Sequence, residues 1–162
     1  MAATAASRLC VGLFLMGWLG MCALNGAQAA DQRDARSILA PYRGRNRVLV
    51  VFAPSRKDAR YKQQSAWLET QPAGLNERDL ILIYALADGK GRRVGNRLFG
   101  AGNENALRHP YGVGPRQFRV ILIGKDGHEA YSSQQPISAT RLYGLIDAMP
   151  MRRGEMRRKQ RH

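Results

Sequence analysis

The sequence predicts an α/β domain, and three patterns support that fold class. Two almost entirely apolar segments, 48–52 and 79–86, flank a helix-like stretch, and a βαβ unit with a right-handed crossover explains this order. A third apolar segment, 118–123, is followed by the turn sequence Asp126-Gly127, which is typical of a β-hairpin. Apolar residues with helical spacing then recur within 138–149. These patterns alone do not choose among the small α/β folds.

A signal peptide is predicted at residues 1–29. Arg8 precedes the apolar run 9–24, and Ala27-Gln28-Ala29 supplies the small residues that a signal peptidase accepts. The apolar run is shorter than the roughly 20 residues that cross a bilayer comfortably. Cleavage is therefore favoured over the alternative, an uncleaved N-terminal anchor.

The rest of the chain is expected to be one domain, 30–150, and a basic tail, 151–162, in the periplasm or secreted, with no transmembrane span. Both cysteines, Cys10 and Cys22, precede the predicted cleavage point, so the mature chain would hold no thiol. Arg8 is the one basic residue that cleavage removes, so the net charge falls only from +14 to +13. This excess indicates an anionic partner or environment, or a surface that is merely kept soluble by arginine.

The first half of the domain is expected to begin with a short helix or turn at 31–42 and a basic turn at 43–47. The strand at 48–52 is apolar at every position, which is typical of a strand covered on both faces. Ser55 or Asp58 can cap the following helix, and Asp58 would also suit the positive end of its dipole. Residues 72–74, Pro-Ala-Gly, are expected to terminate the helix. One face of that helix would carry Tyr61, Gln64, Trp67 and Leu68.

The second half starts from the strand at 79–86. Residues 88–97 are rich in glycine and basic residues, which indicates an exposed hairpin turn or a long loop. A short helix is predicted over 103–111, and a strand over 129–131 should run antiparallel to the strand at 118–123. Ser138 is expected to cap the last helix and Pro150 to stop it.

The tail, 151–162, is expected to be too polar to pack, and therefore to be mobile or a frayed helix. The order of the preceding elements, a βαβ unit, a short helix, a β-hairpin and a C-terminal helix, is that of a thioredoxin-like domain.

Four stretches carry a resemblance to a known family: Arg47-Val-Leu-Val-Val-Phe-Ala-Pro, Glu77-Arg-Asp-Leu, Ile123-Gly-Lys-Asp-Gly and Ile146-Asp-Ala-Met-Pro-Met-Arg-Arg-Gly-Glu-Met-Arg157. Over roughly 38–157 the sequence resembles a family named only as a domain of unknown function, found in exported bacterial proteins. Related domains occur in vertebrate extracellular proteins with sushi repeats. The resemblance implies a thioredoxin-like fold, distantly similar to peroxiredoxins, and an exported location. It implies no established reaction.

The loop after the first strand is where a thioredoxin-like fold would hold its reactive sulfur. Aligning Ala53-Pro54 with the thioredoxin motif Ala-Pro-x-Cys-x-x-Cys places the two cysteines at Arg56 and Ala59. Aligning Pro54 with the peroxiredoxin motif Pro-x-x-x-Thr-x-x-Cys places the threonine at Asp58 and the cysteine at Tyr61. Thiol–disulfide exchange and peroxide reduction both need a thiolate. The mature chain is therefore not expected to be a dithiol oxidoreductase or a peroxidase.

No metal site or cofactor is expected, because no pair of histidines has ligand spacing and the glycines of 89–91 match no nucleotide-binding motif. The candidate ligand loop instead contains Ser55, Arg56, Lys57, Asp58 and Tyr61.

Three basic clusters are candidate anion-binding sites. Their members are Arg43, Arg45 and Arg47; Lys90, Arg92, Arg93 and Arg97; and Arg152, Arg153, Arg157, Arg158, Lys159 and Arg161. Arginine suits bidentate contact with phosphate or carboxylate. Few aromatic residues lie among them, which disfavours nucleic acid as the partner. An anionic envelope component or an acidic protein surface fits the charge better.

The favoured hypothesis is therefore an exported, thioredoxin-like, non-catalytic binding or interaction module. The alternative is an enzyme with a non-thiol site formed by Arg56, Asp58 and Tyr61. A concave pocket in which these side chains converge would favour the enzyme, and a filled or flat loop would favour the module. A third hypothesis is a purely structural or envelope-associated protein whose tail alone binds.

Overall fold

The structure, a computed structural model, describes residues 37–89, 92–94 and 103–161. The predicted signal peptide, 1–29, lies outside the described residues, as do Lys90 and Arg97. The cleavage site therefore stays a prediction.

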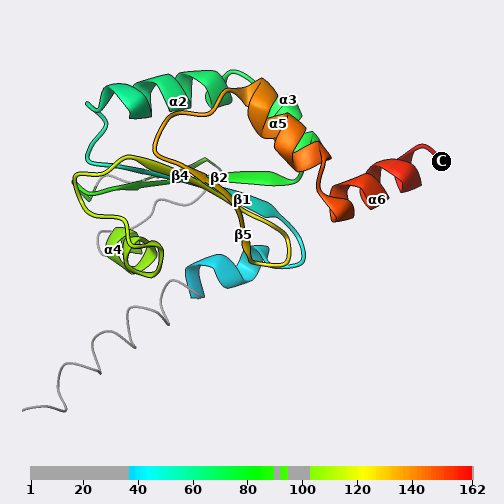
Figure 1. The fold of residues 1–162 in the computed structure, drawn as a ribbon, viewed down its shortest axis with the longest axis horizontal. Helices are drawn as coiled ribbons and strands as arrows, with labels where there is room; N and C mark the ends of the chain where they lie inside the picture. Colours follow the sequence, from blue (N-terminus) through cyan, green and yellow to red (C-terminus); the bar gives the residue numbers. More distant parts are fainter. Residues whose placement is uncertain (1–36, 90–91, 95–102, 162) are drawn as a thin grey trace, which may run out of the picture.

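Five strands form one mixed sheet with the order β3-β2-β1-β4-β5, which is shown in Figure 1. The strands are β1 (Arg47–Ala53), β2 (Leu80–Leu86), β3 (Arg92–Val94), β4 (Arg119–Ile123) and β5 (Glu129–Ser133). β1 pairs in parallel with β2 and antiparallel with β4. The parallel pair separated by a helix confirms the predicted βαβ unit and the α/β class.

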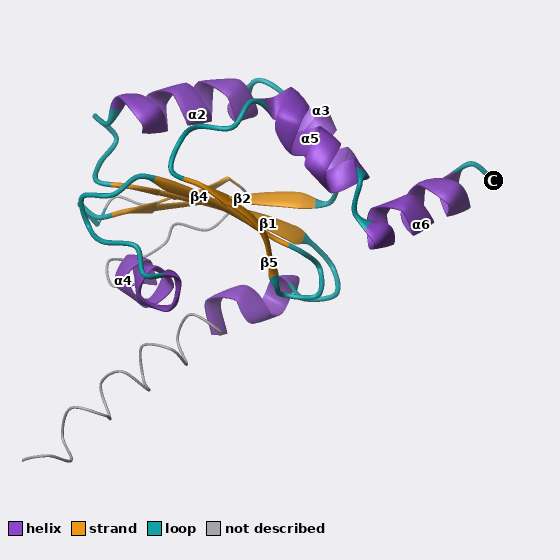
Figure 2. Ribbon diagram, viewed as in Figure 1, coloured by secondary structure: helices purple, strands orange, loops and turns teal. Residues whose placement is uncertain are grey.

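Helices cover both faces of the sheet (Figure 2). On one face lie α2 (Ala59–Glu69), α3 (Pro72–Glu77) and α5 (Ala139–Asp147); on the other lie α4 (Asn103–Arg108) and the 3₁₀ helix η1 (Ala40–Tyr42). This explains why β2, and β1 from Val48 onward, have apolar side chains on both faces of the sheet.

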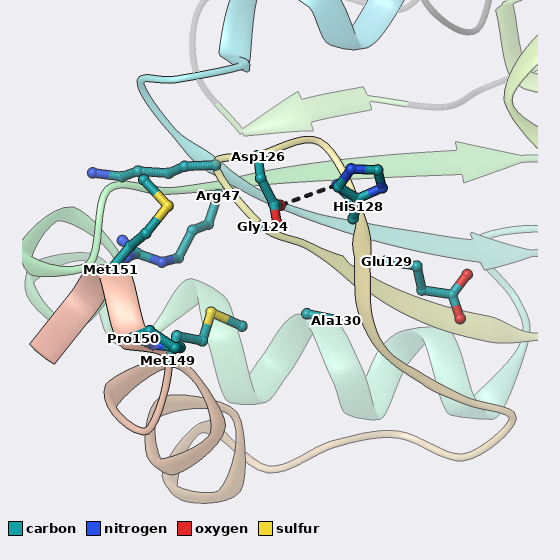
Figure 3. A pocket seen from close by; sticks show the side chains of 10 residues that line it. Arg47, Gly124, Asp126, His128, Glu129, Ala130, Met149, Pro150 and Met151 are labelled. Atoms are coloured by element: carbon teal, nitrogen blue, oxygen red, sulfur yellow. Dashed lines mark hydrogen bonds between the residues drawn. The ribbon is translucent and has the colours of Figure 1, made fainter.

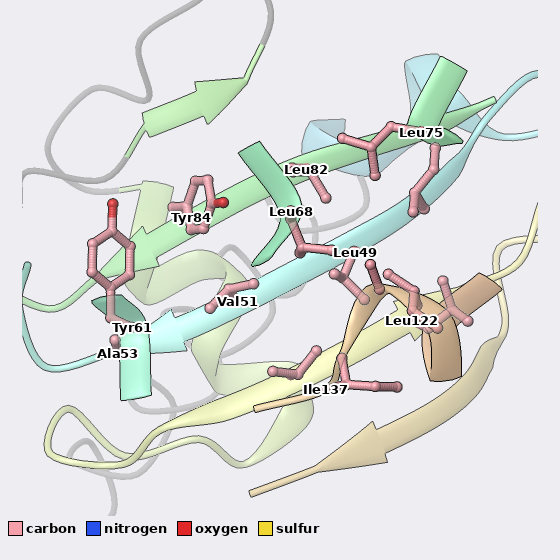
Figure 4. Close-up of a cluster of buried hydrophobic side chains, with 14 of the residues drawn as sticks. Leu49, Val51, Ala53, Tyr61, Leu68, Leu75, Leu82, Tyr84, Leu122 and Ile137 are labelled. Atoms are coloured by element: carbon pink, nitrogen blue, oxygen red, sulfur yellow. The ribbon is translucent and has the colours of Figure 1, made fainter. Parts of the chain in front are cut away.

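β1 divides its side chains between two hydrophobic clusters, because successive residues of a strand point to opposite faces. Leu49 and Val51 belong to the cluster under α2, α3 and α5, which Figure 4 shows. Val50 and Phe52 belong to the cluster on the other face. All seven residues of β1, its first residue Arg47 included, are buried.

α2 begins as predicted, because the Asp58 carboxylate accepts hydrogen bonds from the backbone N–H groups of Arg60 and Tyr61. Two other expectations for this region are wrong. Trp67 is 36% exposed, because it lies about 100° around the helix axis from the buried Leu68. Pro72 does not terminate α2, which has already ended at Glu69; it opens α3 instead.

Proline suits the first turn of a helix, where its missing N–H would have no partner. The same preference explains why the segment after Pro150, which was expected to be a mobile tail or a frayed helix, begins a helix. Pro150 is the first residue of α6 (Pro150–Lys159), which continues the chain after α5. The described part of the predicted tail is thus largely helical, and α6 extends away from the body at the end of the sheet where α5 ends (Figure 1).

The remaining elements agree with the sequence predictions, except that a short strand, β3, lies within the stretch 88–97 that was expected to be a turn or loop. β4 and β5 form the predicted antiparallel hairpin around the Asp126-Gly127 turn. β3 pairs antiparallel with β2, so the chain turns back after β2. α4 is followed by the 3₁₀ helix η2 (His109–Tyr111). Among the described helices, none combines the length and apolar character needed to cross a membrane.

Candidate functional site

The five side chains of the candidate ligand loop lie between the end of β1 and the first turn of α2, and most of them serve local structure. The Ser55 hydroxyl accepts a hydrogen bond from the Lys57 N–H at 3.2 Å. Asp58 caps α2 and also pairs with the Arg60 guanidinium at 2.9 Å. This hydrogen bond is the main reason that the pKa of Asp58 lies below its usual range. Arg56 and Lys57 are exposed.

Tyr61, the residue that aligns with the cysteine when Pro54 is aligned with the peroxiredoxin motif, is buried and belongs to the core. Its ring meets that of Tyr84 edge to face, with centroids 5.3 Å apart. Arg56 is exposed while Tyr61 is buried, and the Asp58 carboxylate is occupied by the helix cap. The three side chains therefore lie in different environments: solvent, the core and the helix cap.

Arg108 closes the carboxyl ends of the two parallel strands, the edge where open α/β sheets commonly bind ligands. Its guanidinium donates to the carbonyl oxygens of Ala53 at 2.6 Å and Ala85 at 2.9 Å, the first on β1 and the second on β2. It also reaches the Gly114 carbonyl at 2.8 Å. Burial lowers the pKa of Arg108, which is only 4% exposed. No local pattern in the sequence marks Arg108, because it lies 55 and 23 positions away from the two strand-end residues that it contacts.

At the opposite end of the sheet, four bases and four acids form a network that we call the α6 ion network. Its members are Arg47, Glu77, Arg78, Asp79, Lys125, Asp147, Arg152 and Glu155. They come from β1, the end of α3 and the following turn, the β4–β5 turn, α5 and α6. The network therefore fastens α6 to the sheet.

Glu155 and Asp147 are the two bridging acids of this network. Glu155 accepts hydrogen bonds from Arg47 at 3.2 Å and from the Lys125 ammonium at 2.7 Å. Burial raises the pKa of Glu155, but the hydrogen bonds from Lys125 and Arg47 outweigh it and the pKa lies below its usual range.

Asp147 joins Arg78 and Arg152, at 2.6 Å and 3.1 Å. Burial raises its pKa, and the hydrogen bonds from these two arginines lower it further than burial raises it. Both acids are therefore held in their charged form.

Two of the predicted anion-binding residues have their charge used inside the protein. Arg47 is 1% exposed and pairs with Glu155; Arg152 is 5% exposed and pairs with Glu77 and Asp147. The prediction that these two arginines contact an external anion is therefore corrected. The basic segments at 43–47 and 151–162 each contain inward-facing and outward-facing residues, which composition does not distinguish.

The outward side of α6 is basic. Arg153 and Arg157 lie four residues apart on α6, so they share a face of the helix, and Arg161 follows just beyond its end. These three and the neighbouring Arg158 and Lys159 are all exposed. Arg43 and Arg45 are likewise exposed. For Arg92 and Arg93 the structure describes the backbone of β3 but not the side chains.

A cavity of about 210 Å³ lies beside the α6 ion network, between the β4–β5 turn and the junction of α5 with α6. Met149, Pro150 and Met151 form one side of it, and Gly124 and Asp126 lie on the other (Figure 3). Arg47 contributes to its lining. Its position between turn and helix shows that α6 does not pack flush against the hairpin. In the described ranges, histidines and carboxylates form no group that could hold a metal ion.

Comparison with known families decides where this chain belongs. The model of a family described as "Domain of unknown function (DUF4174)" matches residues 38–155. The chain belongs to this family. The matched range contains every member of the α6 ion network, so this DUF4174 domain includes the first half of α6 and not only the sheet and its covering helices.

Several curated proteins contain a segment similar to this DUF4174 chain. Coiled-coil domain-containing protein 80 of Danio rerio is 27% identical over 147 residues, which is 76% of this chain and 16% of that protein. Sushi repeat-containing protein SRPX of Homo sapiens is 24% identical, covering 76% of this chain and 27% of that protein. For SRPX2 of Rattus norvegicus the values are 24%, 78% and 28%. The chain thus spans less than a third of each of these relatives.

A solved structure supports the fold assignment. The 2-Cys peroxiredoxin of Plasmodium vivax, in its reduced form, superposes with a TM-score of 0.52 and 18% sequence identity, over 73% of this chain and 84% of that one. The predicted thioredoxin-like fold is thereby confirmed. At this level of identity the likeness concerns the fold alone.

Proposed function

We propose that this DUF4174 chain is an exported, non-catalytic binding module, and that the outward side of α6 contacts an anionic partner. The partner is an anionic envelope component or an acidic protein surface. The single observation that carries the proposal is the division of α6 into an anchored side, with Arg152 and Glu155, and an exposed side made of Arg153, Arg157 and Arg158.

The exposed side is unfavourable for an isolated helix. Arginines four residues apart repel one another and destabilise a helix by roughly 0.2–0.5 kcal/mol per pair. Within α6, Arg153 and Arg157 are such a pair. The ion network offsets this cost by holding the helix on the sheet, and an anionic surface would relieve it by neutralising the repelling charges.

The non-catalytic part of the proposal rests on the loop between β1 and α2. Asp58 and Tyr61 are used by the helix cap and the core, and Arg108 fills the ends of the parallel strands. The chain has no cysteine after Cys22. Thiol chemistry would therefore have to use a residue of the segment that signal cleavage is predicted to remove.

The test compares two variants with the same net charge. Arg153→Gln with Arg157→Gln removes two charges from α6, and Lys62→Gln with Arg141→Gln removes two exposed charges elsewhere. Co-sedimentation is measured with vesicles of anionic and of neutral lipid at low salt. Each basic residue near an anionic surface contributes about 1 kcal/mol, so the α6 variant should bind anionic vesicles on the order of 10–30-fold more weakly.

An acidic protein surface is tested in the same way, with a polyglutamate column in place of the vesicles. Weaker retention of the α6 variant on either matrix, with the control variant close to wild type, supports the proposal. If both variants lose binding equally, binding depends on the net charge of the chain and not on the position of the charges, and the proposal would fail. Binding that is insensitive to salt would also contradict it.

Deleting 151–162 is a poorer test than these substitutions. The deletion removes Glu155 and Arg152, so Arg47 would be left buried without its carboxylate. An uncompensated buried charge destabilises a fold strongly. A loss of binding after deletion would then confuse unfolding with loss of the contact surface.

A further inference from the structure

A second arginine cluster lies at the end of the sheet opposite α6, where β4 begins beside the first turn of α2. In this region β1 ends, since Phe52 is paired with Arg119. Figure 1 shows α6 and the start of α2 at opposite ends of the sheet. A cleft of about 140 Å³ is found here, lined by Arg60, Arg116, Gln117, Phe118, Arg119 and Gln134.

Fixed contacts position two of the guanidinium groups. Arg119 donates to the Tyr111 carbonyl at 2.9 Å, and the Arg60 guanidinium lies over the Phe118 ring, 5.3 Å from its centroid. Arg116 is exposed. Cationic groups held in place by other bonds lose less conformational freedom when a ligand binds, which favours affinity.

Three arginines line the cleft, and none of its lining residues is acidic. Asp58 pairs with Arg60, so the charge of Arg60 is largely balanced. Arg116 and Arg119, in contrast, have no carboxylate within salt-bridge distance among the described residues. Two arginines without a counter-charge from the described chain, Arg116 and Arg119, therefore line the cleft.

The amide side chains add hydrogen-bond donors. The Gln117 side-chain oxygen accepts a hydrogen bond from the Gly114 N–H at 2.9 Å, which leaves its NH₂ group as the part free to donate. Gln134 approaches from the chain that follows β5. Residues with donor groups thus line the cleft from α2, from the segment that leads into β4 and from the chain after β5.

We propose that this cleft binds a tetrahedral oxyanion, a phosphate or sulfate group, either free or as an ester on a small molecule. Several donors around a small volume suit an anion with oxygens in several directions, and guanidinium groups bind such oxyanions in bidentate fashion. The site goes beyond the proposed contact surface on α6, because it lies at the other end of the sheet and shares no residue with it.

The first test is isothermal titration calorimetry of the full chain at low salt with inorganic phosphate, inorganic sulfate and acetate. Arg116→Gln is the main variant, since Arg116 is exposed and makes no contact on which the fold depends. Loss of one charge-assisted contact should weaken phosphate binding about tenfold or more. Arg119→Gln should weaken it at least as much, with circular dichroism to check that the fold persists.

Arg141→Gln is the matched control, because it removes one exposed charge from α5, and it should leave phosphate binding within about twofold of wild type. Absence of phosphate and sulfate binding to the wild-type chain would overturn the inference. Acetate binding as tight as phosphate would overturn the tetrahedral assignment, and so would equal weakening by Arg116→Gln and Arg141→Gln.

A further arm separates the two sources of the group. Glucose 6-phosphate binding as tightly as inorganic phosphate, or more tightly, assigns the site to an ester; binding of inorganic phosphate alone assigns it to the free ion. The variant Arg153→Gln with Arg157→Gln should bind phosphate like wild type. The failure of the α6 proposal and the failure of this one are thereby distinguishable.

Discussion

Arg47 and Glu155, which are 108 positions apart in the chain, form a bidentate ion pair with nitrogen–oxygen distances of 3.2 and 3.3 Å. Arg47 is the first residue of β1 and is 1% exposed, whereas Glu155 lies in the middle of α6. The pair joins the central strand of the sheet to the last helix. It explains how a helix as polar as α6 remains attached to the domain.

Removing the Glu155 charge should destabilise the whole fold. Glu155→Gln leaves the Arg47 guanidinium buried beside a neutral group, and breaking a buried pair in this way costs about 3 kcal/mol or somewhat more. The free energy of unfolding, measured by urea denaturation at pH 7, should fall by this amount. Helical signal in circular dichroism should also fall as α6 frays.

Glu129→Gln is the control for that experiment, because Glu129 is an exposed carboxylate on β5. Its effect should stay within about 0.5 kcal/mol. If Glu155→Gln changes stability no more than Glu129→Gln does, Glu155 does not anchor α6.

Stability should decrease in acid because of the bridging carboxylates. Asp147 and Glu155 have pKa values in the folded state that are lowered from the ordinary values of 3.8 and 4.5. Below those ordinary values the unfolded chain takes up protons that the folded chain still excludes. The stabilisation is thus complete above about pH 5 and is lost as the pH falls through the lowered folded values.

The measurement is the free energy of unfolding between pH 7 and pH 3 for wild type and for Asp147→Asn with Glu155→Gln. The double variant should be less stable at pH 7 and should lose less stability in acid. An unchanged slope in the double variant would show that other groups control the acid transition.

Arg108 should be required for stability, because it supplies the donors for two carbonyl groups at the strand ends and for the Gly114 carbonyl in the loop before β4. Arg108→Met keeps much of the side-chain volume but leaves those carbonyls unsatisfied, which should cost about 2–4 kcal/mol. Arg141→Met, on the exposed side of α5, should change the free energy of unfolding by less than about 0.5 kcal/mol. Similar effects of the two substitutions would contradict the role of Arg108.

Asp58 should behave as a helix cap. Asp58→Ala should lower the free energy of unfolding by about 1 kcal/mol, whereas Asp58→Asn should preserve most of it because asparagine caps helices as well as aspartate does. The lost pair with Arg60 adds little, since Arg60 is 40% exposed. A large loss with asparagine would show that the charge of Asp58 has a role beyond capping.

Much of the fold could be predicted from the sequence because the signals are local. The apolar character of β1 and β2 required cover on both faces, and the turn at Asp126-Gly127 indicated the hairpin. The absence of a cysteine from the segment that follows β1 was also visible directly in the sequence. The prediction that Pro72 and Pro150 end helices was wrong, because each is the first residue of a helix.

The candidate sites depended on contacts that no local pattern contains. The sequence shows that the chain is basic and that arginines cluster near both ends of the domain, but it does not show which ones are accessible. Arg47, Arg78 and Arg108 find their partners 108, 69 and 55 positions away. An arginine is buried only where carboxylate or carbonyl oxygens come within hydrogen-bond distance of it. Only the tertiary structure brings those oxygens there, so it alone separates the structural arginines from those left for a partner.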